Sequence, residues 1–124
     1  MASLELDKDK LTVRMHGLDK FWSWTSTLTI PLSHVTEVAL VSADPVLHEL
    51  GWFDKRVGTH WPGKFAMGTF NLGDDIVFLD LHHENAKAVQ LTCTGEKVKK
   101  VIVELVDQDP NEWVGRLQSA LRAK

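Results

Sequence analysis

The feature that most constrains the fold is a change of hydrophobic period near Asp109. Before this residue, apolar side chains mostly alternate with polar ones in short runs, as in Leu11 to Met15 and Val89 to Cys93. Alternation with a period of two is typical of strands that bury one face. The runs recur about every ten residues, between turn-forming residues. This spacing predicts an antiparallel sandwich or barrel rather than a parallel sheet with crossover helices.

After Asp109, the apolar residues follow a helical period. Asp109 suits the N-cap of a helix, and Pro110 suits its first position. Trp113, Leu117 and Leu121 then recur on one stripe. The sequence therefore predicts one amphipathic C-terminal helix whose apolar stripe covers the sheets.

About seven strands are expected before this helix, together with two short helices. One helix is expected over Leu18 to Trp22, and another begins at Asp44 as its N-cap and ends at Gly51. Pro31 indicates that its strand is an edge strand or leaves the sheet at that point, and untidy alternation from Val35 to Val41 indicates a bulge. The last three strands are expected to form an antiparallel meander. The strand-like runs are Leu4–Leu6, Leu11–Met15, Thr25–Leu32, Val35–Val41, Phe65–Asn71, Ile76–Leu81, Val89–Cys93 and Val101–Leu105.

An aromatic stretch from Gly51 to Phe70 has neither period in its first half, although it holds two tryptophans and three phenylalanines. On one interpretation, these rings close the second opening of a barrel. On the other, aromatic anchors and cations form an exposed rim that binds a protein or another copy of the chain. The binding residues expected on the second interpretation are Trp52, Lys55, Arg56, His60, Trp61 and Lys64.

The layout of strands and a closing helix resembles that of stand-alone bacterial proteins of the pleckstrin-homology-like class. The motifs that carry this resemblance are Leu11-Thr12-Val13, the run from Leu28 to Val35, Gly58-Thr59-His60-Trp61-Pro62-Gly63, Gly68-Thr69-Phe70, and Val101-Ile102-Val103-Glu104 before Asp109-Pro110. The resemblance spans nearly the whole chain. It implies a barrel or orthogonal sandwich of about seven antiparallel strands, capped by one amphipathic helix.

Binding of anionic lipid headgroups is the alternative function that the resemblance raises. Pleckstrin-homology domains that hold phosphoinositides use a basic cluster around the first hairpin, where this chain has Lys8, Lys10 and Arg14. Asp7 and Asp9 lie beside the two lysines and dilute their charge. A membrane-binding surface would require these cations to gather with Lys55, Arg56 and Lys64.

A small metal-binding protein or enzyme is the second alternative, using His60, His82 and His83. The nearest metal-ligand set is His82, His83 and Glu84, with His60 or His48 as a further member. Adjacent strand residues point to opposite faces, so His82 and His83 could share an ion only on an irregular turn. Cys93 lies on the apolar side of its strand, which predicts a buried thiol rather than a nucleophile. Without a convergent set of groups, we expect no enzymatic activity, catalytic residue, metal or cofactor.

Length and charge limit the remaining function classes. A chain of 124 residues has room for one core, so we expect a single domain over residues 1–124. The net charge of −3, with both signs interspersed, argues against nucleic acid as a partner. One cysteine, no signal peptide and no apolar run of about 18 residues indicate a cytoplasmic protein. The leading interpretation is a non-enzymatic interaction module that binds a protein partner or forms a homo-oligomer.

Overall fold

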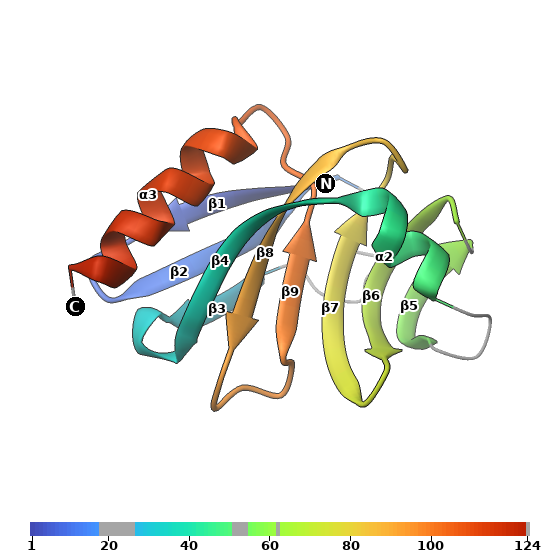
Figure 1. Ribbon diagram of the computed structural model, residues 1–124, viewed down its shortest axis with the longest axis horizontal. Coiled ribbons are helices and arrows are strands. Elements are labelled where there is room, and N and C mark those ends of the chain that lie inside the picture. Colours follow the sequence, from blue (N-terminus) through green and yellow to red (C-terminus); the bar gives the residue numbers. More distant parts are fainter. Residues whose placement is uncertain (18–26, 51–54, 62, 124) are drawn as a thin grey trace.

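A computed structural model describes residues 1–17, 27–50, 55–61 and 63–123, with the backbone alone for Lys55 and Val57 (Figure 1). These residues form a mainly β structure with a C-terminal helix. The strands are β1 (Ala2–Leu6), β2 (Lys10–Met15), β3 (Thr27–Pro31), β4 (Val35–Ser42), β5 (Lys55–Trp61), β6 (Phe65–Leu72), β7 (Asp75–Leu81), β8 (Lys87–Cys93) and β9 (Lys100–Val103). The helices are α2 (Ala43–Glu49) and α3 (Pro110–Arg122), and a 3-10 turn, η1, covers Leu32–His34.

The strands form two sheets, and within the described ranges they do not close into a barrel. The smaller sheet has the order β1-β2-β3 and is antiparallel throughout. It contains the predicted first hairpin, and β3 is an edge strand that ends at Pro31 as expected. The larger sheet has the order β4-β8-β9-β7-β6-β5. The predicted bulge is present where the register shifts between Val35 and Glu37.

The predicted antiparallel meander of the last three strands is wrong. Strand β9 lies between β7 and β8, pairing parallel with β7 from Val77 opposite Lys100 to Asp80 opposite Val103. Strand β8 pairs antiparallel with β9 and β4 (Figure 1). The larger sheet is therefore mixed. Alternation identifies the strands but carries no information about which neighbour each one takes.

Strand β5 occupies the stretch in which the sequence shows no period. Its pairing with β6 shifts between Lys55 and Val57, and Gly58 then lies opposite Gly68. Gly58 has φ +132°, and a Cβ atom there would lie 2.1 Å from the carbonyl oxygen of Met67. A register shift and a close glycine pair both interrupt the alternation by which a strand is recognised.

The short helix α2 begins earlier than expected. Ser42 is its N-cap and makes no side-chain capping bond, while the expected cap, Asp44, lies in the first turn. The expected helix over residues 18–22 and the expected end at Gly51 lie outside the described residues. Helix α3 begins as predicted, because the side chain of Asp109 accepts a hydrogen bond from the backbone N–H of Asn111.

The two faces of the larger sheet bury two apolar clusters. On one face Phe78, Val101 and Leu91 pack with the smaller sheet and with α3. On the other face Leu79 and Ile102 pack with residues of α2. In α3, Trp113 and Leu117 are buried as predicted, and Leu121 is half-buried. Neither helix of the described part is long and apolar enough to cross a membrane.

Two glycine substitutions test this backbone. Gly58→Ala should lower the free energy of unfolding by at least about 1 kcal/mol, because the new Cβ meets backbone and φ is positive. Gly115→Ala, in α3 with nothing within 4 Å of the added Cβ, should raise it by about 0.5 to 1 kcal/mol. Urea unfolding measures both values. Equal effects at the two positions would contradict the described approach of β5 to β6.

Candidate functional site

Three segments meet at one end of the larger sheet: the turn between β5 and β6, the turn between β7 and β8, and helix α2 (Figure 1). The backbone N–H of Gly63 donates to the carbonyl of Leu47 in α2 at 3.2 Å. The Lys64 ammonium lies 3.5 Å from the carboxylate of Glu84 in the β7–β8 turn. These contacts hold side chains from distant parts of the sequence on one surface.

Trp61 is the exposed large apolar side chain of the described residues, with 55% of its surface accessible. It lies at the end of β5 and pairs across the strands with half-buried Phe65. A pocket of about 300 Å³ is lined by Thr59, Phe65, Met67 and His82, so it adjoins the cross-strand neighbour of Trp61. By contrast, Phe70 is fully buried. The aromatic stretch thus supplies both the core and the surface.

The structure brings only part of the expected binding set together. Trp61 and Lys64 belong to one turn, in which the Lys64 N–H donates to the Trp61 carbonyl at 2.9 Å. His60 lies on the opposite face of β5, with its ring edge-on to Phe70 at 5.1 Å. Arg56 is exposed near the other end of the strand, 3.3 Å from the Asn71 side-chain oxygen. Trp52 and the side chain of Lys55 lie outside the described residues.

Two buried carboxylates lie at the same end of the larger sheet, and sequence reasoning did not single out either of them. Asp80 is fully buried and Glu104 is 4% exposed, the two buried charged residues of the described chain. Each interrupts an apolar run, Leu79-Asp80-Leu81 and Val103-Glu104-Leu105, which is the signal that could have identified them. Buried acids need hydrogen-bonding or charged partners. The groups that contact each carboxylate show its structural role.

Glu104 fixes the β7–β8 turn. One carboxylate oxygen accepts the backbone N–H groups of His82 and His83, each at 2.9 Å. The other oxygen contacts Nδ1 of His83. Asp80 lies 3.1 Å from the Met1 amino group and 3.3 Å from Nε2 of His82. The two imidazoles are therefore engaged by different carboxylates, with ring centroids 6.3 Å apart.

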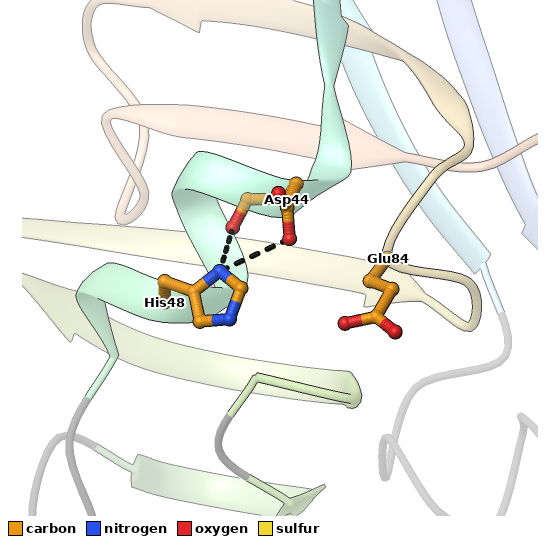
Figure 2. A group of neighbouring side chains, drawn as sticks. All are labelled: Asp44, His48 and Glu84. Carbon is orange, nitrogen blue, oxygen red and sulfur yellow. Dashed lines mark hydrogen bonds and ion pairs between the residues drawn. The ribbon is translucent and has the colours of Figure 1, made fainter.

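A different group offers metal ligands. Asp44 and His48, four residues apart on α2, and Glu84 of the β7–β8 turn each present one ligand atom, and these atoms lie within 4.8 Å of one another. Figure 2 shows the Glu84 carboxylate projecting into the space beside the His48 ring. Sequence reasoning grouped Glu84 with His82 and His83 and considered His48 as a further member, but it did not include Asp44. The four-residue spacing of Asp44 and His48 was the missed signal.

A second pocket adjoins the same turns. It measures about 470 Å³ and is lined by Lys64, Phe65, His82, His83, Glu84 and Asn85. His82 and Phe65 border both this pocket and the smaller one. The linings combine apolar, cationic and anionic groups, which are suited to recognising a ligand with apolar and charged parts.

Cys93 is buried, as its place on the strand predicted. Burial raises the pKa of its thiol from the ordinary 9.0 to about 11, with Glu96 adding to the rise and Lys99 opposing it. The neutral thiol therefore favours the folded state. This contribution to stability is present below pH 9 and is lost as the pH rises to about 11.

Comparisons with protein-family models, curated proteins and solved structures found no match for this chain. The arrangement of its own residues is therefore the basis for assigning a function.

The Glu104 contacts can be tested by truncation. Glu104→Ala should lower the free energy of unfolding by at least about 2 kcal/mol, because two backbone N–H groups lose a charged acceptor. Glu37→Ala, at an exposed position of β4, should change it by less than about 0.5 kcal/mol. Urea unfolding measures both. A Glu104→Ala variant as stable as Glu37→Ala would show that the β7–β8 turn does not depend on this carboxylate.

The Cys93 thiol should resist modification in the folded protein. At pH 8, a thiol reagent should label it about a hundredfold more slowly than in urea, because two pKa units lower the thiolate fraction by that factor. Absorbance of the released product follows the reaction. Equal rates in the folded and unfolded chain would contradict the buried position.

Proposed function

We propose that the chain is a non-enzymatic interaction module that binds an extended segment of a partner protein. Binding occurs at the Trp61 surface, which consists of Trp61, Lys64 and Phe65. The observation that carries the proposal is the exposure of Trp61 at the end of an edge strand.

An exposed tryptophan beside a pocket is a typical anchor for protein recognition. Tryptophan offers a large rigid apolar surface and is enriched among the residues that dominate binding energy. The pocket of about 300 Å³ beside Phe65 can accept one apolar side chain of the partner. A binding segment would therefore place an apolar residue in this pocket and stack another part against the Trp61 ring.

Strand β5 supports an extended segment as the ligand. It is the last strand in the order of the larger sheet within the described residues, so a further strand can be added alongside it. Strand addition supplies backbone hydrogen bonds, while pockets select side chains. The Trp61 surface would then select the side chains of the segment, and β5 would supply backbone hydrogen bonds that do not depend on its sequence.

Charges on β5 and its turn favour a partner segment that carries acidic residues. Arg56 is exposed on β5, and exposed Lys64 belongs to the Trp61 surface. Opposite charges attract and steer association, so acidic residues of the segment would be drawn to these two cations.

We also propose that the chain is a bacterial pleckstrin-homology-like protein that acts in the cytoplasm. The sequence motifs, the two sheets and the C-terminal helix packed against β4 and β8 support this assignment. The parallel pairing of β7 with β9 departs from the antiparallel pattern of the class.

The cations of the lipid-binding alternative are spread over the molecule. The β1–β2 turn, which carries Lys8, and strand β5 lie at opposite ends in Figure 1. Arg14 lies 3.5 Å from Glu5, and Lys64 lies 3.5 Å from Glu84. We therefore place binding at the Trp61 surface.

The proposal can be tested by selecting peptides from a random display library on the immobilised full chain. The enriched peptides should combine an apolar residue with acidic ones. Trp61→Ala should weaken their binding at least tenfold, about the loss expected for an anchor tryptophan. Lys8→Ala, at the other end of the molecule, should leave binding unchanged. Fluorescence anisotropy of labelled peptides measures the affinities.

Sedimentation of the same variants separates the other outcomes. A dimer that dissociates in Trp61→Ala would make a second copy the partner and overturn the choice of occupant. Unchanged peptide affinity in a folded Trp61→Ala variant would overturn the proposed surface. If that variant unfolds, Lys64→Glu keeps the ring and must still weaken binding of the acidic peptides.

A further inference from the structure

We propose that Asp44, His48 and Glu84 form an open binding site for a divalent first-row transition metal, with Zn²⁺ as the preferred ion. This metal site goes beyond the proposed protein-binding function and does not rest on it. Its three ligands are not among the residues that define the Trp61 surface, although Lys64 of that surface pairs with Glu84.

The chain brings the three ligands together from two elements. Asp44 and His48 lie on the same side of α2, because residues four apart are neighbours on a helix. Glu84 approaches from the β7–β8 turn (Figure 2). One ligand atom from each side chain lies within 4.8 Å of the other two, so small side-chain rotations would bring all three onto one ion.

The His48 ring is held in position before any metal arrives. Its Nδ1 lies 3.0 Å from the Asp44 carboxylate and 3.1 Å from the Asp44 carbonyl oxygen. On another side it meets the backbone of Gly63, where a Cβ atom would lie 3.3 Å from Cδ2 and Nε2 of the ring. Any larger residue at position 63 would press on this imidazole.

The third ligand is also carried on a fixed support. The buried Glu104 carboxylate accepts the N–H groups of the two residues immediately before Glu84. This bond network is independent of α2. Two rigid supports therefore direct three side chains to one point, which is what a metal site requires of its scaffold.

The donor set indicates the class of ion. Two carboxylates neutralise a divalent cation, and an imidazole nitrogen favours Zn²⁺ and similar metals over Mg²⁺ and Ca²⁺, which prefer oxygen ligands. Three protein ligands leave at least one position for water. The ligands are partly exposed, with side-chain accessibility of 47% for Asp44, 61% for His48 and 38% for Glu84, so water can reach the ion.

Lys64 is a competitor built into this site. Its ammonium lies 3.5 Å from the Glu84 carboxylate, where it opposes a second positive charge. Removing that ammonium should strengthen metal binding. The effect has the opposite sign to that of removing a ligand. Dependence of Zn²⁺ binding on the His48 imidazole is what separates this site from nonspecific binding to surface acids.

The test is calorimetric titration of the chelator-treated full chain with Zn²⁺, and with Mg²⁺ in parallel. One equivalent of Zn²⁺ should bind, and Mg²⁺ should not. His48→Ala and Glu84→Gln should each weaken Zn²⁺ binding by more than about tenfold, as expected from removal of a coordinating side chain. Lys64→Gln should strengthen it. His83→Gln removes the neighbouring imidazole and should leave the affinity unchanged.

Other outcomes would overturn the site. These are the absence of saturable Zn²⁺ binding, equal affinity in the wild type and the His48→Ala/Glu84→Gln double variant, or a loss confined to His83→Gln. Circular dichroism checks that each variant is folded. Because the three ligands are partly exposed, their substitution should preserve the fold.

Discussion

The parallel pairing of β9 with β7 determines where the candidate functional groups lie. Both strands are covered on their two faces, since Phe78 and Val101 point into one core while Leu79 and Ile102 point into the other. The parallel register also brings the C-terminal ends of the two strands to the same end of the larger sheet. There the N–H of Glu104 donates to the carbonyl of Asp80 at 2.9 Å. An antiparallel arrangement would have sent Glu104 to the opposite end of the sheet.

The contacts at this end of the sheet explain how two buried acids are tolerated beside apolar strands. Desolvating a carboxylate is costly unless hydrogen bonds or charges replace the water. Glu104 has two backbone N–H donors and an imidazole, and Asp80 has an amino group and an imidazole. The hydrogen bonds that stabilise the Glu104 carboxylate also fix the β7–β8 turn. A rigid turn at the end of a buried strand is a suitable support for functional side chains.

The sequence predicted which segments form strands and helices better than it predicted which strands pair with each other. Alternation located the first hairpin, β6, β7 and β8, and the Asp109-Pro110 pair located the start of α3. The parallel partner of β9 could not be predicted, because the same alternation serves either strand direction. Strand β5 was missed because a register shift and Gly58 break its pattern. Among the residues of the candidate site, sequence reasoning singled out Trp61, Lys64 and Glu84. The roles of Asp80 and Glu104, and the approach of Glu84 to Asp44 and His48, depend on contacts between distant segments.

Lys64 links the two proposals, since it belongs to the Trp61 surface and also pairs with Glu84. A metal held by Glu84 would repel this ammonium and leave it available to an acidic partner segment. A partner carboxylate that takes Lys64 would, in turn, remove a positive charge from beside the metal ligands. Binding free energies that share one charged group are coupled, and the coupling is reciprocal. If both sites are used, each ligand should therefore raise the affinity for the other by the same factor, and this coupling should vanish when Lys64 is replaced by glutamine.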